Sequence, residues 1–137
     1  MTLIIRGGKT MINYDTYKQN PDPILVEESE ILFGEMVKEE YLRDEDYKEI
    51  LEDLLGKAVE YASIRSKWLL MERQQRISED DARSKKHDSV IIKFNMLAKY
   101  MEMQGWDSSW REKLGNERKR IGDFACYIAY VYGINAR

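Results

Sequence analysis

The sequence predicts an all-α protein, a bundle of about four helices with a short extended segment at the N-terminus. Three observations lead to this prediction. The 137 residues include only two prolines, so long stretches contain no helix-breaking residue. Apolar residues recur every three or four positions through most of the chain, which is the period of an amphipathic helix. Acidic or Ser/Asn residues stand where most of the helices are expected to begin.

Residues 1–20 are expected to form an extended or flexible segment, followed by one helical domain over residues 21–137. Thr2–Arg6 is a candidate strand. Gly7–Thr10 echoes the end of a phosphate-binding loop but lacks its full spacing, so no nucleotide site is predicted. Both Met1 and Met11 are candidate first residues.

The first two helices have clear predicted starts. Asp22 is expected to cap the first helix, with Pro23 at its first position, where a missing N–H costs nothing. This helix is expected to reach about Tyr41. Asp44 is expected to cap a long second helix that runs to Gln75 and forms the spine of the fold.

The third helix is expected to open at Ser78–Asp81, which is similar to a capping box. Its first half, Asp80–Asp88, is almost entirely polar, so we expect this part to project into solvent. Gly105 is expected to end the helix in the left-handed conformation that glycine adopts freely.

The C-terminal part is expected to hold one short turn and one apolar helix. Asp107–Ser109 caps the turn, which continues to Leu114. Asn116 caps the last helix, which runs to Tyr132 and ends at Gly133. The apolar stripe of this helix predicts a core position for its body.

The net charge of −3 hides an uneven distribution. Residues 1–60 carry 7 basic and 15 acidic side chains, a balance of −8, and residues 61–137 carry 15 and 10, a balance of +5. Opposite charge in the two halves indicates internal neutralisation within one bundle or head-to-tail association of two copies. Internal neutralisation is the favoured interpretation, because surface charge pairs contribute little.

Composition also predicts where the protein works. A single cysteine excludes an intramolecular disulfide framework and fits a reducing compartment. No apolar run reaches the roughly 18 residues of a membrane span, and Leu3–Ile5 is too short for the apolar part of a signal peptide. We therefore expect a cytoplasmic protein that does not enter a membrane.

Two chemically reactive residues are expected to be inert. His87 is the only histidine, which argues against a zinc or di-iron site and against a hydrolase with a histidine base. It lies among polar residues and is expected to be solvated. Cys126 lies in the apolar last helix and is expected to be a buried, unreactive thiol. No cofactor and no catalytic activity are predicted.

Paired carboxylates supply the one enzymatic alternative. Glu27 and Glu30 lie on the first predicted helix, and Glu49, Glu52 and Asp53 lie on the second. Such pairs on facing helices bind Mg²⁺ for nucleotide hydrolysis, and the pattern resembles the all-α nucleoside triphosphate pyrophosphatases. In that family the second pair ends in aspartate, whereas here Asp53 comes one position late. Acidic first turns also occur because of the helix dipole alone.

Basic and aromatic residues in the second half form a candidate binding surface for an acidic protein or for nucleic acid. The sequence pI of about 5.3 disfavours nucleic acid. The three cations of the last helix occupy its first turn, where they are unfavourable unless an anion binds there. The candidate contact residues are Arg83, Lys85, Lys86, Trp106, Trp110, Arg118, Lys119 and Arg120.

The runs Trp110–Gly115, Arg120–Tyr127 and Ile134–Arg137 carry a family resemblance. From about Glu79 onward the chain resembles a family of small uncharacterised proteins from low-GC Gram-positive bacteria, their phages and mobile elements. The resemblance implies no activity. It implies a context in which small helical proteins regulate genes or inhibit host enzymes by binding them.

The leading prediction is therefore a non-enzymatic interaction protein of phage or mobile-element origin. Such a protein would bind and modulate a host protein, as a regulator or an anti-defence inhibitor, or act as a homodimer. A helical regulator that binds nucleic acid is the first alternative. A Mg²⁺-dependent pyrophosphatase is the second.

Overall fold

The computed structural model describes residues 24–135, with side chains up to residue 132. Over this range it contains six helices and no strand, which confirms the predicted all-α bundle. Residues 1–23, which include Thr2–Arg6, Gly7–Thr10 and the Asp22–Pro23 start, lie outside the described part. The helices are α2 (Val26–Met36), α3 (Glu39–Leu42), α4 (Glu45–Leu69), α5 (Arg73–Met103), α6 (Trp110–Leu114) and α7 (Arg118–Asn135).

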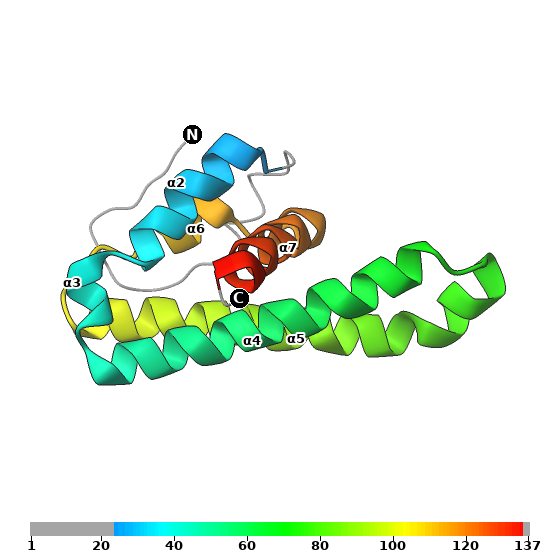
Figure 1. The fold of residues 1–137 in the computed structure, drawn as a ribbon, viewed down its shortest axis with the longest axis horizontal. Helices are drawn as coiled ribbons and strands as arrows, with labels where there is room; N and C mark the ends of the chain where they lie inside the picture. Colours follow the sequence, from blue (N-terminus) through cyan, green and yellow to red (C-terminus); the bar gives the residue numbers. More distant parts are fainter. Residues whose placement is uncertain (1–23, 136–137) are drawn as a thin grey trace.

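The long helices α4 and α5 form an antiparallel hairpin that runs the length of the molecule (Figure 1). Helix α7 packs on the middle of this hairpin, mainly against α4. Helix α2 contacts α6 and α7, and α3 connects it to α4. The turn that joins α4 to α5 projects beyond all the other helices (Figure 1).

The first predicted helix is in fact two. It was expected to start at Pro23 and continue to about Tyr41, but Leu25 is extended and α2 begins at Val26. Helix α2 then ends at Met36, and α3 begins at Glu39. Met36 and Tyr41 are both buried, and five positions on one helix would separate their directions by about 140°. The break lets both side chains face the core, and the hydroxyl of Tyr47 donates to the carbonyl of Met36 at 2.5 Å.

The start of α4 was predicted correctly, and its end was not. Asp44 caps the helix, because its Oδ1 accepts a hydrogen bond from the backbone N–H of Tyr47 at 3.0 Å. The helix ends at Leu69 rather than Gln75, and α5 begins at Arg73 rather than at Ser78.

The chemistry of the turn explains these boundaries. Glu72 and Gln75 form a capping box at the start of α5. The guanidinium of Arg76 donates to the carbonyl of Leu69 at 2.8 Å and to that of Met71 at 3.1 Å. The last carbonyl of α4 is therefore satisfied by a side chain, and those of Lys67 and Trp68 accept from the backbone N–H groups of Leu70 and Met71, so the chain can reverse within three residues.

The predicted end of α5 is correct, whereas the predicted start and end of α7 are not. Gly105 has φ = 77° just after α5, as predicted. The last helix begins at Arg118, two residues after the expected cap Asn116, and it continues through Gly133. Glu117 satisfies its free N–H groups, because its carboxylate accepts from the backbone N–H of Lys119 and of Arg120.

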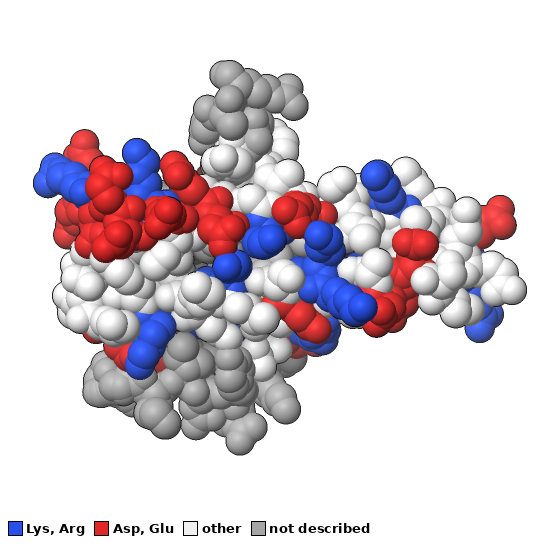
Figure 2. Space-filling model, turned by 90° about the horizontal axis from the view of Figure 1, so that it is seen from below, with Lys and Arg blue, Asp and Glu red and all other residues white. Residues whose placement is uncertain are grey.

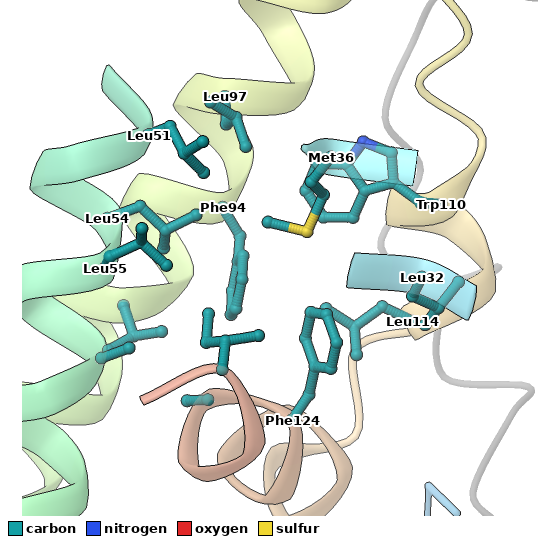
Figure 3. Packing of buried hydrophobic residues seen from close by; sticks show 14 of the residues in the cluster. Leu32, Met36, Leu51, Leu54, Leu55, Phe94, Leu97, Trp110, Leu114 and Phe124 are labelled. Carbon is teal, nitrogen blue, oxygen red and sulfur yellow. The ribbon is translucent and has the colours of Figure 1, made fainter. Parts of the chain in front are cut away.

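One contiguous core lies between the hairpin and the shorter helices (Figure 3). Phe94 occupies its centre, with its ring stacked on Phe124 at 5.5 Å and the edge of Trp110 at 6.1 Å. Burial of such aromatic and aliphatic side chains is the main source of stability. The largest fully buried apolar side chains are Leu32, Met36, Tyr47, Leu54, Phe94, Leu97, Met101, Trp110 and Phe124.

Candidate protein-docking site

Two predicted contact residues are buried, which corrects their assignment to a binding surface. Arg120 is 1% exposed, forms an ion pair with Glu28, and donates to the carbonyls of Leu114 at 2.5 Å and of Lys113 at 2.8 Å. Trp110 is equally buried, and its indole lies in the core. Neither side chain is available to a partner in this conformation.

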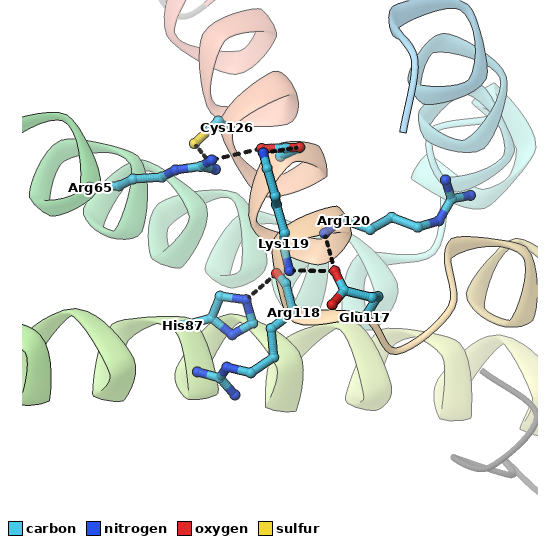
Figure 4. A network of polar contacts seen from close by, with 8 residues as sticks. Arg65, His87, Glu117, Arg118, Lys119, Arg120 and Cys126 are labelled. Atoms are coloured by element: carbon cyan, nitrogen blue, oxygen red, sulfur yellow. Dashed lines mark hydrogen bonds and ion pairs between the residues drawn. The ribbon is translucent and has the colours of Figure 1, made fainter. Parts of the chain in front are cut away.

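The remaining predicted cations each have a carboxylate partner within the chain. The N···O distances of these pairs lie between 2.8 and 3.2 Å. The two pairs made by α7, together with the cap from Glu117 (Figure 4), balance the charge of its first turn without any external anion. The pairs are Arg83–Asp80, Lys85–Asp81, Lys86–Glu60, Arg118–Asp88 and Lys119–Asp123.

Trp106 belongs to an aromatic cluster rather than to an open surface. It is half-buried and stacks on Tyr41 at 4.5 Å, with Tyr47 and Tyr100 against it at 5.3 and 6.0 Å. This cluster fastens α3 to the end of the hairpin, so the structure gives Trp106 a packing role.

The structure does not bring the five candidate metal ligands together. Glu27 and Glu30 lie on α2, which packs on α6 and α7, whereas Glu49, Glu52 and Asp53 lie on α4. Asp53 forms an ion pair of 2.5 Å with Lys93 of α5. Among residues 24–132, no group of three His, Cys, Asp or Glu side chains has an arrangement that could hold a metal ion.

The prediction that His87 is solvated is wrong. The side chain is 2% exposed at the junction of α4, α5 and α7, where it meets the ring of Tyr61 edge-on at 5.3 Å. Its Nε2 lies 2.8 Å from the carbonyl oxygen of Arg118 (Figure 4). The spacing of His87 from Val90 and Phe94 places it on the buried stripe of α5, a signal that its polar neighbours obscured.

The environment of His87 keeps its imidazole neutral. A carbonyl only accepts hydrogen bonds, so Nε2 carries the proton, and Nδ1 finds no partner among the described residues. Burial lowers the pKa of His87 below the ordinary value of 6.5, although the contact with the Arg118 carbonyl opposes this effect. Protonation would add a buried N–H without an acceptor.

This geometry predicts that acid destabilises the protein through His87. The folded state has the lower pKa, so the unfolded chain binds the proton first as the pH falls. The stability that neutral His87 gives the folded state is fully present above pH 6.5. It is lost as the pH drops from 6.5 through the lowered pKa of the folded state. Urea unfolding across this pH range is expected to show a steeper loss of stability for the wild type than for His87→Gln. Identical pH profiles would contradict the assignment.

Cys126 was expected to be buried but is half-buried, beside Arg65, whose Nη1 lies 3.5 Å from the sulfur (Figure 4). Burial raises the pKa of the thiol, and the guanidinium partly opposes this. The same Arg65 pairs with Asp123 at 2.7 Å, which ties α4 to α7. A thiol with a raised pKa carries little thiolate at neutral pH, and this fits the expected lack of reactivity.

An apolar groove that the sequence did not reveal lies on the outer face of the hairpin. This groove has a volume of about 430 Å³ and is open to solvent. Ile92, Met96 and Met103 expose about half or more of their surface there, whereas the opposite face of α5 is in the core. Its lining consists of Ile50, Ile92, Asn95, Met96, Lys99, Tyr100 and Met103.

Carboxylates border the groove on the side of α4. Residues 44–53 contain six carboxylates and one lysine, a net charge of −5. Asp46 and Asp53 lie one turn before and after Ile50, and Glu49 precedes it. Figure 2 shows the resulting acidic band over one end of the hairpin. Within the described range, Asp46 and Glu49 form no ion pair.

Comparison with protein-family models, with curated proteins and with solved structures finds no similar protein. None of the helices between residues 24 and 135 is both long and apolar enough to cross a membrane.

Proposed function

We propose that this chain is an interaction protein without catalytic activity, and that it binds a partner protein in the groove between α4 and α5. The exposed stripe of Ile92, Met96 and Met103 carries this proposal. These side chains lie outside the core cluster, and their position together on one helix face is typical of a contact surface.

The shape and composition of the groove suit an apolar helix or turn of the partner. Grooves between two helices bind apolar side chains presented at helical spacing. The two methionines add adaptability, because unbranched thioether side chains repack around different partners. The context implied by the C-terminal resemblance makes a host protein the first partner to seek.

Affinity capture from a lysate of the cell that carries the gene tests this proposal. The bait is the full chain, and the groove variant is Ile92→Glu with Met96→Glu. Ile31→Glu is the matched control, because Ile31 is a similarly exposed apolar residue on α2. We expect at least one protein that the wild type and Ile31→Glu retain and that the groove variant loses. Equal retention by all three baits, or retention of none, would refute the proposal.

A further inference from the structure

The turn between α4 and α5 carries a second set of exposed apolar residues. Leu69 is 53% exposed, Leu70 is 89% exposed and Ile77 is 64% exposed. This end of the hairpin projects away from the other helices (Figure 1). We call the segment of residues 64–77 the tip.

The conformation of the tip is fixed by contacts that do not involve the side chains of Leu69 and Leu70. Arg76 binds the carbonyls of Leu69 and Met71, and the indole N–H of Trp68 donates to the carbonyl of Arg76 at 3.2 Å. The ring of Trp68 also lies against the guanidinium groups of Arg76 and Arg83, at 4.9 and 4.5 Å. The contacts of Arg76 and Trp68 therefore fix the turn on which Leu69 and Leu70 are exposed.

The tip carries the opposite charge to the border of the groove. Residues 64–77 contain four basic residues and one acidic residue, a net charge of +3. Arg65 and Arg76 are engaged within the chain. Lys67 and Arg73 form no ion pair with a described residue, so their charge is available at the surface.

The tip cannot reach the groove of its own chain. Leu69 and Ile50 lie on the same helix, separated by 19 positions, and at 1.5 Å per residue this is about 28 Å. A contact between these complementary surfaces must therefore join two molecules.

We propose that the tip of one copy docks in the groove of a second copy. Leu69 and Leu70 cover the apolar floor around Met96, while Lys67 and Arg73 face the carboxylates that border it. This inference rests on the proposed function, because it names an occupant of the same groove. One contact also explains the exposed apolar residues of both the tip and the groove. Two copies can make this contact reciprocally in a dimer, or many copies can repeat it from head to tail.

Charge reversal on each side gives a direct test by sedimentation velocity over a range of protein concentrations. The wild type is expected to associate as concentration rises, and less so at high salt. Asp46→Lys with Glu49→Lys puts cations at two positions on the border of the groove, where they would face Lys67 and Arg73. Lys67→Glu with Arg73→Glu puts carboxylates at the two tip positions that would face Asp46 and Glu49. Each double variant alone then opposes like charges, which weakens association by about tenfold or more.

The decisive sample is an equimolar mixture of the two double variants. The reversed groove now faces a reversed tip, and the native groove of the other variant still faces a native tip, so we expect association to return. Restored association in the mixture also shows that both variants are folded. Glu27→Lys with Glu30→Lys on α2 changes the net charge equally and is expected to leave association intact.

A wild type that stays monomeric at all concentrations would overturn this inference, and so would a mixture that stays monomeric. Neither result contradicts the proposed function if affinity capture from the lysate still finds a protein whose retention depends on the groove. Loss of association in Leu70→Asp would support the contact, because this fully displayed side chain has no role in the fold.

Discussion

Replacing Arg120 by methionine is expected to lower the free energy of unfolding by about 3 kcal/mol. Methionine keeps most of the apolar volume but removes every donor of the guanidinium. The carbonyls of Lys113 and Leu114 then lose a donor in a buried place, and Glu28 loses its cation. Chemical denaturation followed by circular dichroism measures the change.

Two matched variants separate the buried network from charge alone. Arg118→Met removes a cation two positions earlier, but that side chain is 53% exposed in its pair with Asp88, so the expected change is below about 1 kcal/mol. Glu28→Gln is expected to cost less than Arg120→Met, because Glu28 retains 38% exposure. If all three changes were similar, the buried guanidinium would have no special role.

Gly122→Ala is expected to destabilise the protein by about 2 kcal/mol. A Cβ atom at this position would lie 2.6 Å from the hydroxyl oxygen of Tyr61, and 3.3 Å from Nη1 of Arg65. Tyr61 is buried and cannot swing away. Gly56 is the control, because nothing lies within 4 Å of its Cβ position. There alanine is expected to stabilise α4 by up to about 1 kcal/mol through helix propensity.

A double-mutant cycle identifies the clash. Tyr61→Phe removes the oxygen that the new methyl group would meet, so Gly122→Ala is expected to cost much less in that background. The coupling between the two positions is expected to be about 1 kcal/mol or more, measured from urea unfolding of the four proteins. Additive effects would show that α4 and α7 do not approach each other through this glycine.

The parts of the fold that local chemistry determines were predictable. Asp44 and Gly105 act within one turn of themselves, so their cap and stop signals could be read directly. The hairpin turn was misplaced because Glu72 is an unusual cap, and because Arg76 supplies donors that belong to the folded turn. The break after Met36 likewise depends on burial that only the tertiary structure creates.

The candidate site was harder to predict, for two physical reasons. Charged residues were taken as exposed, yet Arg120 is buried because Glu28, 92 positions away, meets it. Helix α5 carries a second apolar stripe, Ile92, Met96 and Met103, on the face opposite Phe94. Its spacing is also helical, and periodicity alone does not show whether a partner or solvent covers such a stripe.

The order in which the helices meet has a consequence for synthesis on the ribosome. Helices α4 and α5 are neighbours in sequence, so their hairpin can form as soon as both have emerged. Helix α2 emerges earlier, but its docking partners α6 and α7 are the last to be made. Its buried residues Leu32 and Met36 therefore stay uncovered during elongation. The first described helix to be synthesised therefore cannot pack until the last two have emerged, and its apolar face is exposed throughout elongation.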